Sequence, residues 1–226
     1  MAFIIATLLA KRQAIKEGFS QDLVVDLAGY ILVAGIIGAR LLYVAINLKE
    51  YQKTPIEILM LQHGGLSFYG GALVAFLASI WFLKRHKVPF LKIADLLAPF
   101  LALGQSIGRL GCLLRGCCFG RIVQSGLRIK FPDEVVYRHP TQVYASIIDF
   151  LIFVLLKRLY RRRHPEGEIF LLFVILYSFK RFSLDFLRGD VAPIYSGLTV
   201  FQIISLFILI VSCSIFIFRR CKALKK

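Results

Sequence analysis

The chain has 226 residues, of which 58% are hydrophobic and 19% are charged, and its formal net charge is +16. An ordinary soluble domain carries more charge and fewer apolar residues. The apolar residues of this chain form long blocks, and the charged residues fall mostly between them. The composition therefore excludes an ordinary soluble domain and predicts an all-α polytopic membrane protein.

Seven apolar blocks are expected to form transmembrane helices, of which the first is incomplete. They cover about residues 2–10, 23–47, a stretch that follows 62–71 and ends near 83, and then 93–115, 141–156, 168–185 and 197–218. As a helix, the first block measures only about 15 Å, half of a bilayer core. The sequence shows no repeat and no second domain, so one membrane domain is expected over residues 1–226, with a small outer-face loop at about 116–138.

Basic residues gather at the ends of apolar blocks. The four clusters are Lys11, Arg12 and Lys16; Lys84, Arg85, Lys87 and Lys92; Lys157, Arg158, Arg161, Arg162 and Arg163; and Arg219, Arg220, Lys222, Lys225 and Lys226. Short cytoplasmic loops of membrane proteins collect Lys and Arg in this way. We therefore expect these clusters and the C-terminus in the cytoplasm, and the segments 48–56, 116–138 and 186–195 on the outer face. Topology accounts for the net charge, so no nucleic-acid partner is expected.

Three polar clusters interrupt the apolar sequence, at residues 63–71, 108–120 and 177–188. Arg40, Arg109 and Arg181 lie within or near predicted spans, where a charged side chain is costly and usually functional. A guanidinium stays charged and forms paired hydrogen bonds to phosphate oxygens. These residues predict a lipid-accessible polar cavity that binds a phosphate-bearing membrane lipid. Alternatively, the arginines pair with the acidic residues of the spans or extend to the membrane surface.

The motifs around these arginines resemble those of the bacterial phosphatidylglycerol–prolipoprotein diacylglyceryl transferases. The matching segments, in chain order, are Gly38–Tyr43, Gly64–Gly71, Gly108–Cys112 with Gly116 and Gly120-Arg121, Arg138–Tyr144, Tyr177–Arg188 and Gly197–Gln202. The resemblance implies an inner-membrane enzyme that moves the diacylglyceryl group of phosphatidylglycerol to the lipobox cysteine of a prolipoprotein signal peptide. It also implies that no metal or organic cofactor is needed.

The resemblance assigns roles to particular residues. Tyr69, Arg109 and Arg181 are the expected catalytic residues, and the two arginines would hold the lipid phosphate and stabilise the leaving group. Tyr177 would line the cavity. The other expected substrate-binding residues are Arg40, Tyr43, His63, Gly70, Gly71, Gly111, Cys112, Gly116, Cys117, Gly120, Gln142, Tyr144 and Asp185.

The chain departs from the family pattern at several of these positions. Tyr69 stands where the family has a His that is a candidate base, Cys112 where it has Asn, and Cys117 where it has Glu. Ala145 and Asp185 also stand at positions where Glu is usual. Two alternatives therefore stay open: a divergent paralogue with another acceptor, and a non-catalytic membrane protein that binds lipid.

Cys112, Cys117 and Cys118 allow several interpretations. Cysteines at this spacing on a glycine-broken segment can fill space, form a disulfide, supply a thiol nucleophile or bind a metal. A zinc site normally has four ligands, and only His63 or His139 is available to complete it, so no metal site is expected. A membrane thiol oxidoreductase built on these cysteines is a weaker alternative. His63 either forms a hydrogen bond to the backbone at the start of a helix or takes the role of the family histidine that Tyr69 replaces.

Overall fold

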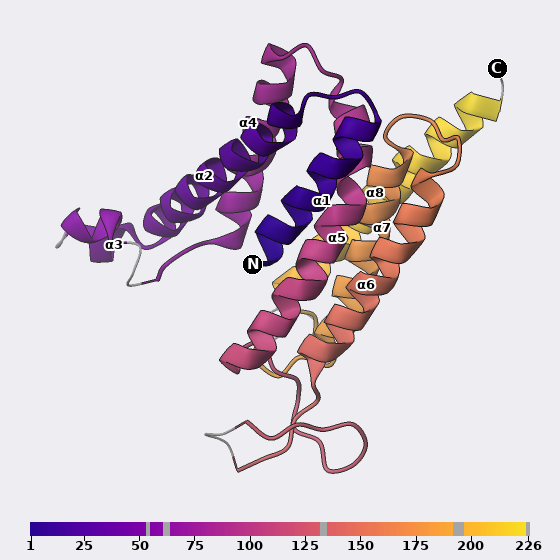
Figure 1. The fold of residues 1–226 in the computed structure, drawn as a ribbon. Helices are drawn as coiled ribbons and strands as arrows, with labels where there is room; N and C mark the ends of the chain where they lie inside the picture. Colours follow the sequence, from indigo (N-terminus) through magenta and orange to yellow (C-terminus); the bar gives the residue numbers. More distant parts are fainter. Residues whose placement is uncertain (53–54, 61–63, 132–134, 192–196, 225–226) are drawn as a thin grey trace. The chain divides into compact units, whose positions relative to one another are not determined.

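The computed structural model describes residues 1–52, 55–60, 64–131, 135–191 and 197–224. Within them the chain is helical, and the only β-pairing consists of isolated bridges. The elements, in chain order, are α1 (Ala2–Lys16), α2 (Gln21–Ile46), α3 (Leu48–Tyr51), the 3-10 helix η1 (Pro55–Leu59), α4 (Phe68–Arg85), α5 (Phe90–Arg115), α6 (Thr141–Tyr160), α7 (Glu168–Asp185) and α8 (Val200–Leu224) (Figure 1). A long helix occupies each of the seven apolar blocks, which confirms the predicted all-α class.

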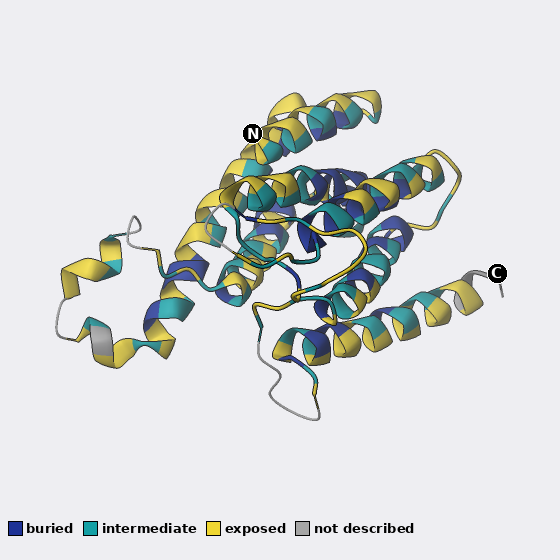
Figure 2. Cartoon of the chain, turned by 90° about the horizontal axis from the view of Figure 1, so that it is seen from below, coloured by how far each residue is buried: buried dark blue, intermediate teal, exposed yellow. Residues whose placement is uncertain are grey.

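Four of the described helices, α2, α4, α5 and α8, are long and apolar enough to cross a membrane. Only 22% of the most apolar window of α2 and 17% of that of α8 is buried within the protein, so most of their apolar surface is available to lipid. Figure 2 shows this exposure along the C-terminal helix. The helices α6 and α7 have 20 and 18 residues but carry charged side chains inside the bundle. The protein is thus a multi-pass membrane protein.

The chain divides into two compact units, one of residues 10–93 and one of residues 1–9 and 94–226. In the first unit, α2 packs against α4 through small residues. A Cβ atom on Gly38 would lie 2.5 Å from the carbonyl oxygen of Gly70, and one on Gly71 would lie 2.9 Å from that of Gly35. Small residues allow transmembrane helices to approach this closely. Gly70 and Gly71, predicted as substrate-binding residues, therefore lie at the α2–α4 crossing.

In the second unit, polar bonds between helices fix the positions of α5, α6 and α7. Ser106 of α5 and Ser146 of α6 each donate a hydroxyl hydrogen bond of 2.9 Å to the other's carbonyl oxygen. Asp95 of α5 accepts hydrogen bonds from the backbone N–H groups of Gly167, at 2.5 Å, and Phe170, at 2.8 Å. These two N–H groups lie at the start of α7 and have no partner within that helix. The two bonds therefore fix the start of α7 against α5.

The apolar core of this unit lies between α5, α6 and α7. Its buried residues are Ala98, Ala102, Ile152, Leu156, Ile169 and Phe173. At the same end as the start of α7, Arg220 of α8 forms a 2.5 Å ion pair with Glu168. The core and these two end contacts leave the opposite ends of α5, α6 and α7 to form a site.

Candidate functional site

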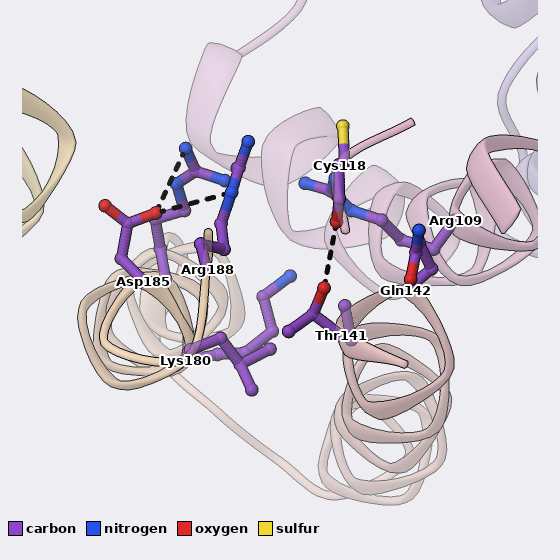
Figure 3. A pocket seen from close by; sticks show the side chains of 10 residues that line it. Arg109, Cys118, Thr141, Gln142, Lys180, Asp185 and Arg188 are labelled. Carbon is purple, nitrogen blue, oxygen red and sulfur yellow. Dashed lines mark hydrogen bonds and ion pairs between the residues drawn. The ribbon is translucent and has the colours of Figure 1, made fainter. Parts of the chain in front are cut away.

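A pocket lies where the end of α5, the start of α6 and the end of α7 meet (Figure 3). Its lining residues are Arg109, Cys118, Thr141, Gln142, Ala145, Lys180, Arg181, Leu184, Asp185 and Arg188. The structure thus brings together the predicted residues Arg109, Gln142, Arg181 and Asp185, which come from three helices. The basic cluster of residues 157–163 lies at the other end of α6.

Lys180 and Arg109 supply positive charge from opposite sides of the pocket. The Nζ atom of Lys180 lies 2.6 Å from Oδ1 of Asp149, and both side chains are almost fully buried. Figure 3 shows the Lys180 amine entering the space between Thr141 and the helix that carries Asp185. Arg109 has no carboxylate within ion-pair distance among the residues that the structure describes. Its guanidinium is therefore the cation best placed to bind an external anion.

Asp185 connects the two remaining cations of the pocket. Its Oδ1 atom lies 3.5 Å from Arg181 and 3.9 Å from Arg188, and its Oδ2 atom accepts a hydrogen bond from the Thr199 hydroxyl. Arg188 also forms a 2.6 Å ion pair with Asp190. Burial alone would raise the pKa of Asp190, but the hydrogen bond and charge of Arg188 hold it below its ordinary value. Arg188 is thus bound by two acids, whereas Arg181 makes one long ion pair with the acids that the structure describes.

The start of α6 adds polar groups that suit an anion. Gln142 donates a 2.7 Å hydrogen bond to the carbonyl of Cys117, and its Oε1 atom is buried without a partner among the described residues. Thr141 donates a 2.8 Å bond to the carbonyl of Cys118. The N-terminus of a helix favours negative charge because its backbone dipoles point their positive ends there. The 20-residue helix α6 therefore adds to the positive potential of the pocket.

Gly120 holds the loop that follows α5 against the pocket. Its N–H donates to the carbonyl of His139, at 3.1 Å, and the next N–H, of Arg121, donates to Leu187, at 2.8 Å. A Cβ atom on Gly120 would lie 2.6 Å from both the Cβ and the carbonyl oxygen of His139. Only glycine fits between these two strands of backbone. The space beside Gly120 is thus filled by backbone, and its contact with substrate stays a prediction.

The end of α5 brings three cysteine sulfurs together. The N–H of Gly116 donates a hydrogen bond to the carbonyl of Leu113, and the N–H of Cys117 donates one to the carbonyl of Cys112. Gly116 has a φ of +70°, and together with these bonds it forms the Schellman motif. In this motif a side chain near the end of the helix contacts the side chain of the second residue beyond the helix. Those two residues are Cys112 and Cys117. Cys118 follows at φ +60°, and the three Sγ atoms all lie within 4.8 Å of one another.

Cys117 is expected to react slowly with alkylating reagents at neutral pH. Burial, followed by the charges of Cys118 and Cys112, raises the pKa of its thiol to about 11. The thiolate is the reactive form, so at pH 7.5, with a chelator present, iodoacetamide should label Cys117 at least about tenfold more slowly than a thiol of ordinary pKa. The rate should rise with pH up to about 11. Peptide mass spectrometry measures both rates, with the exposed Cys221 as internal reference; equal labelling at pH 7.5 would contradict the raised pKa.

Arg40 lies in the other unit, where it binds backbone. Its guanidinium donates to the carbonyl oxygens of Ile58 at 2.9 Å, Gly64 at 2.6 Å, Gly65 at 3.0 Å and Met60 at 3.3 Å, and also to that of Glu57. The side chain is buried. Arg40 therefore organises residues 57–60 and 64–65, and its contact with substrate stays a prediction.

We expect Arg40→Ala to destabilise this segment, because five carbonyl groups lose a charged donor. Hydrogen bonds to charged groups contribute about 1.5–3 kcal/mol each, and part of that loss is recovered from water, so about 2–4 kcal/mol is expected. Hydrogen exchange of residues 57–60 and 64–65 should accelerate. Lys49→Ala, which removes an exposed cation nearby, serves as control. Unchanged exchange in Arg40→Ala would show that the segment does not depend on the guanidinium.

Three further predicted site residues belong to residues 10–93. Tyr43 lies beside Gly65 and makes an edge contact with Tyr51, at 6.4 Å between ring centroids. Tyr69 is half-buried in the first turn of α4 and contacts Phe68. His63 lies outside the described residues. The catalytic role of Tyr69 and the substrate contact of Tyr43 stay predictions.

In residues 94–226, the ring of Tyr177 contacts the pocket residue Lys180, whose Nζ atom lies 4.3 Å from the ring centroid. Tyr144 accepts or donates a 3.4 Å bond with His139, near the loop that follows α5. Gly111 is exposed, and an added Cβ there would meet nothing within 4 Å. The substrate contacts of Gly111 and Tyr144 stay predictions.

Sequence reasoning missed Lys180, Thr141, Arg188 and Asp149 as parts of the site. The sequence does contain an indication for Asp149 and Lys180. Each is a charged residue within a predicted span, at 141–156 and 168–185, and such a residue needs a partner in lipid. The position of Thr141 in the pocket could not be predicted in this way, because a single hydroxyl residue at the start of a helix is common.

The geometry agrees with the result of comparison with known proteins. A family model described as prolipoprotein diacylglyceryl transferase matches residues 1–218. The phosphatidylglycerol–prolipoprotein diacylglyceryl transferase of Clostridium tetani is 33% identical over 221 residues, which cover 96% of this chain and 88% of that protein. The enzyme of the same name from Listeria welshimeri is 34% identical over 98% of this chain and 83% of its own length. This chain therefore belongs to the prolipoprotein diacylglyceryl transferase family.

Proposed function

We propose that this protein transfers the diacylglyceryl group of phosphatidylglycerol to the thiol of a lipobox cysteine in a prolipoprotein signal peptide. One observation carries the proposal: Arg109, without a carboxylate partner among the described residues, faces a pocket that Lys180, Arg181 and Arg188 also line. Such a pocket in a membrane protein suits a lipid phosphate, because guanidinium groups bind phosphate oxygens in pairs. The names of the relatives from Clostridium tetani and Listeria welshimeri support the same reaction.

In the proposed reaction, the cysteine sulfur attacks the glycerol carbon of the diacylglyceryl group that bears the phosphate. A carbon–sulfur bond forms, the carbon–oxygen bond to the phosphate breaks, and glycerol phosphate leaves with the electron pair. Negative charge grows on the leaving phosphate, where Arg109 and Arg181 would stabilise it. Lys180 interacts electrostatically with both arginines and adds a third positive charge to the pocket, although Asp149 offsets part of it.

The thiol must also lose its proton. We assign the acceptor to the phenolate form of Tyr69, since a neutral phenol still holds its own proton. Tyr69 stands where the resembled family has a histidine. The substitution Tyr69→Phe keeps the ring and removes the oxygen, so it should abolish transfer while phosphatidylglycerol binding persists. Retained transfer in Tyr69→Phe would assign the proton to another group.

The proposed orientation places the pocket toward the outer leaflet of the bacterial inner membrane and the C-terminus in the cytoplasm. The basic clusters support it, because Lys and Arg mark cytoplasmic loops. Residues 157–163 adjoin the end of α6, whereas the pocket lies at its start. The pocket is therefore on the side opposite to that cluster.

A transfer assay tests the function directly. Purified protein in liposomes that contain phosphatidylglycerol would be given a lipobox peptide, and mass spectrometry would follow the peptide for the added diacylglyceryl group. We expect a thioether-linked product that does not form with a Cys→Ser peptide. If the lipid binds but is never consumed, the protein is a lipid-binding member of the family and not a transferase.

A further inference from the structure

The cysteines Cys112, Cys117 and Cys118 form a cluster whose thiols take no chemical step in the proposed transfer reaction, although Cys118 lines the pocket. All three are half-buried and free of disulfides. The bonds that position Cys112 and Cys117 are backbone bonds of the helix end, so they do not depend on anything bound to the sulfurs. Cys118 follows directly in the left-handed region, which few residues other than glycine adopt. The backbone therefore holds the three side chains together in advance of any ligand.

We propose that Cys112, Cys117 and Cys118 form a three-thiolate site for a soft, thiophilic metal ion of the zinc, cadmium or copper(I) class. Thiolate sulfur is the preferred ligand of these ions. Three sulfurs at about 2.3 Å from a zinc ion are separated by roughly 3.8–4.0 Å. The Sγ atoms of the cluster all lie within 4.8 Å of one another, so binding needs shifts of less than about 1 Å per sulfur.

The charge balance of the cluster favours a cation. When thiolates crowd together without a counter-ion, their mutual repulsion opposes ionisation. A metal ion removes this repulsion, and each thiol releases its proton to solvent as its sulfur binds. Arg188 interacts electrostatically with Cys118 and lowers the cost of the excess negative charge of a three-thiolate complex. A fourth position stays open for water, as in zinc sites with three protein ligands.

A disulfide explains the cluster less well. It would join two of the sulfurs and leave the third without a role, whereas the helix-end motif and the strained backbone of Cys118 bring all three together. Space filling by small apolar side chains does not require the left-handed conformation at Cys118 either. A metal ion is the occupant that uses all three sulfurs.

Cadmium titration of the purified, reduced full-length protein tests the site. We expect one Cd²⁺ per chain, with sulfur-to-cadmium charge-transfer absorption in the ultraviolet and protection of three cysteines from alkylation. Cys117→Ser should weaken binding more than about tenfold, since loss of even an outer-sphere partner costs that much. The double variant Cys213→Ser/Cys221→Ser, which changes cysteines of α8, should bind as the unmodified protein does.

Two results would overturn the proposal. One is cadmium binding that survives in Cys117→Ser but is lost with Cys213 and Cys221. The other is a reduced protein that binds no cadmium at this cluster. Circular dichroism of the Cys117→Ser protein confirms that it is folded. Because the titration measures metal and not lipid transfer, its outcome is independent of the proposed enzyme activity.

Discussion

Replacement of Arg109 by Ala should reduce transfer by about 10²–10³-fold, the usual effect of removing one donor that stabilises a developing negative charge. Arg109 is the pocket cation without a carboxylate partner among the described residues, so its full charge is available to the phosphate. Arg109→Lys should recover only part of the rate, because an ammonium group cannot form the paired hydrogen bonds of a guanidinium. The liposome assay, run at saturating peptide, measures each rate.

Arg115→Ala provides the matched control for this prediction. Arg115 lies on the same helix, is exposed and does not line the pocket. Its variant should transfer at the normal rate. A normal rate in Arg109→Ala, with the lipid still consumed, would remove Arg109 from the mechanism and leave Arg181 as the candidate phosphate ligand.

Replacement of Lys180 by Met should destabilise the protein by about 3–5 kcal/mol, because it leaves the buried carboxylate of Asp149 without its counter-ion. The Lys180 and Asp149 side chains are 3% and 1% exposed, so water cannot take the place of the lost partner. Met has a similar length and keeps the apolar contacts of the lysine stem. The midpoint of thermal unfolding in detergent should fall accordingly.

The double variant Lys180→Met/Asp149→Asn separates charge from packing. It removes both charges together, so most of the lost stability should return, since a neutral pair often replaces a buried ion pair at little cost. Asp149 also interacts with Arg109, so Asp149→Asn alone removes a favourable charge interaction with each of two cations. If the double variant is as unstable as Lys180→Met, the lysine stabilises the bundle by packing and not by its charge.

The long helices could be predicted from the sequence because each is an apolar block that ends in charged or glycine-containing segments. The block at 23–47 became α2, and the block at 197–218 became α8. Length and hydropathy determine such helices locally, without knowledge of their neighbours. The short elements α3 and η1 were not predicted, because their few residues carry no apolar periodicity.

The site could be predicted only in part. Arg109 and Arg181 were found because a guanidinium within a span needs an anionic partner, and both line the pocket. Arg40 satisfies the same rule and donates to five backbone carbonyls, which the sequence could not predict because it does not say which acceptor an arginine meets. The meeting of three cysteine sulfurs depends on the left-handed turn at Gly116, which spacing alone does not fix.

The hydrogen bond from Thr199 to Asp185 has a consequence for biosynthesis. The residues that line the pocket lie between Arg109 and Arg188 in the sequence. The hydroxyl that binds the Asp185 carboxylate belongs to Thr199, just before α8. A ribosome must therefore translate past Thr199 before Asp185 obtains this donor. Until then, the carboxylate of Asp185, which lies beside Arg181 and Arg188, lacks its hydrogen bond from Thr199. A product that stops before Thr199 therefore lacks the hydroxyl donor of the Asp185 carboxylate.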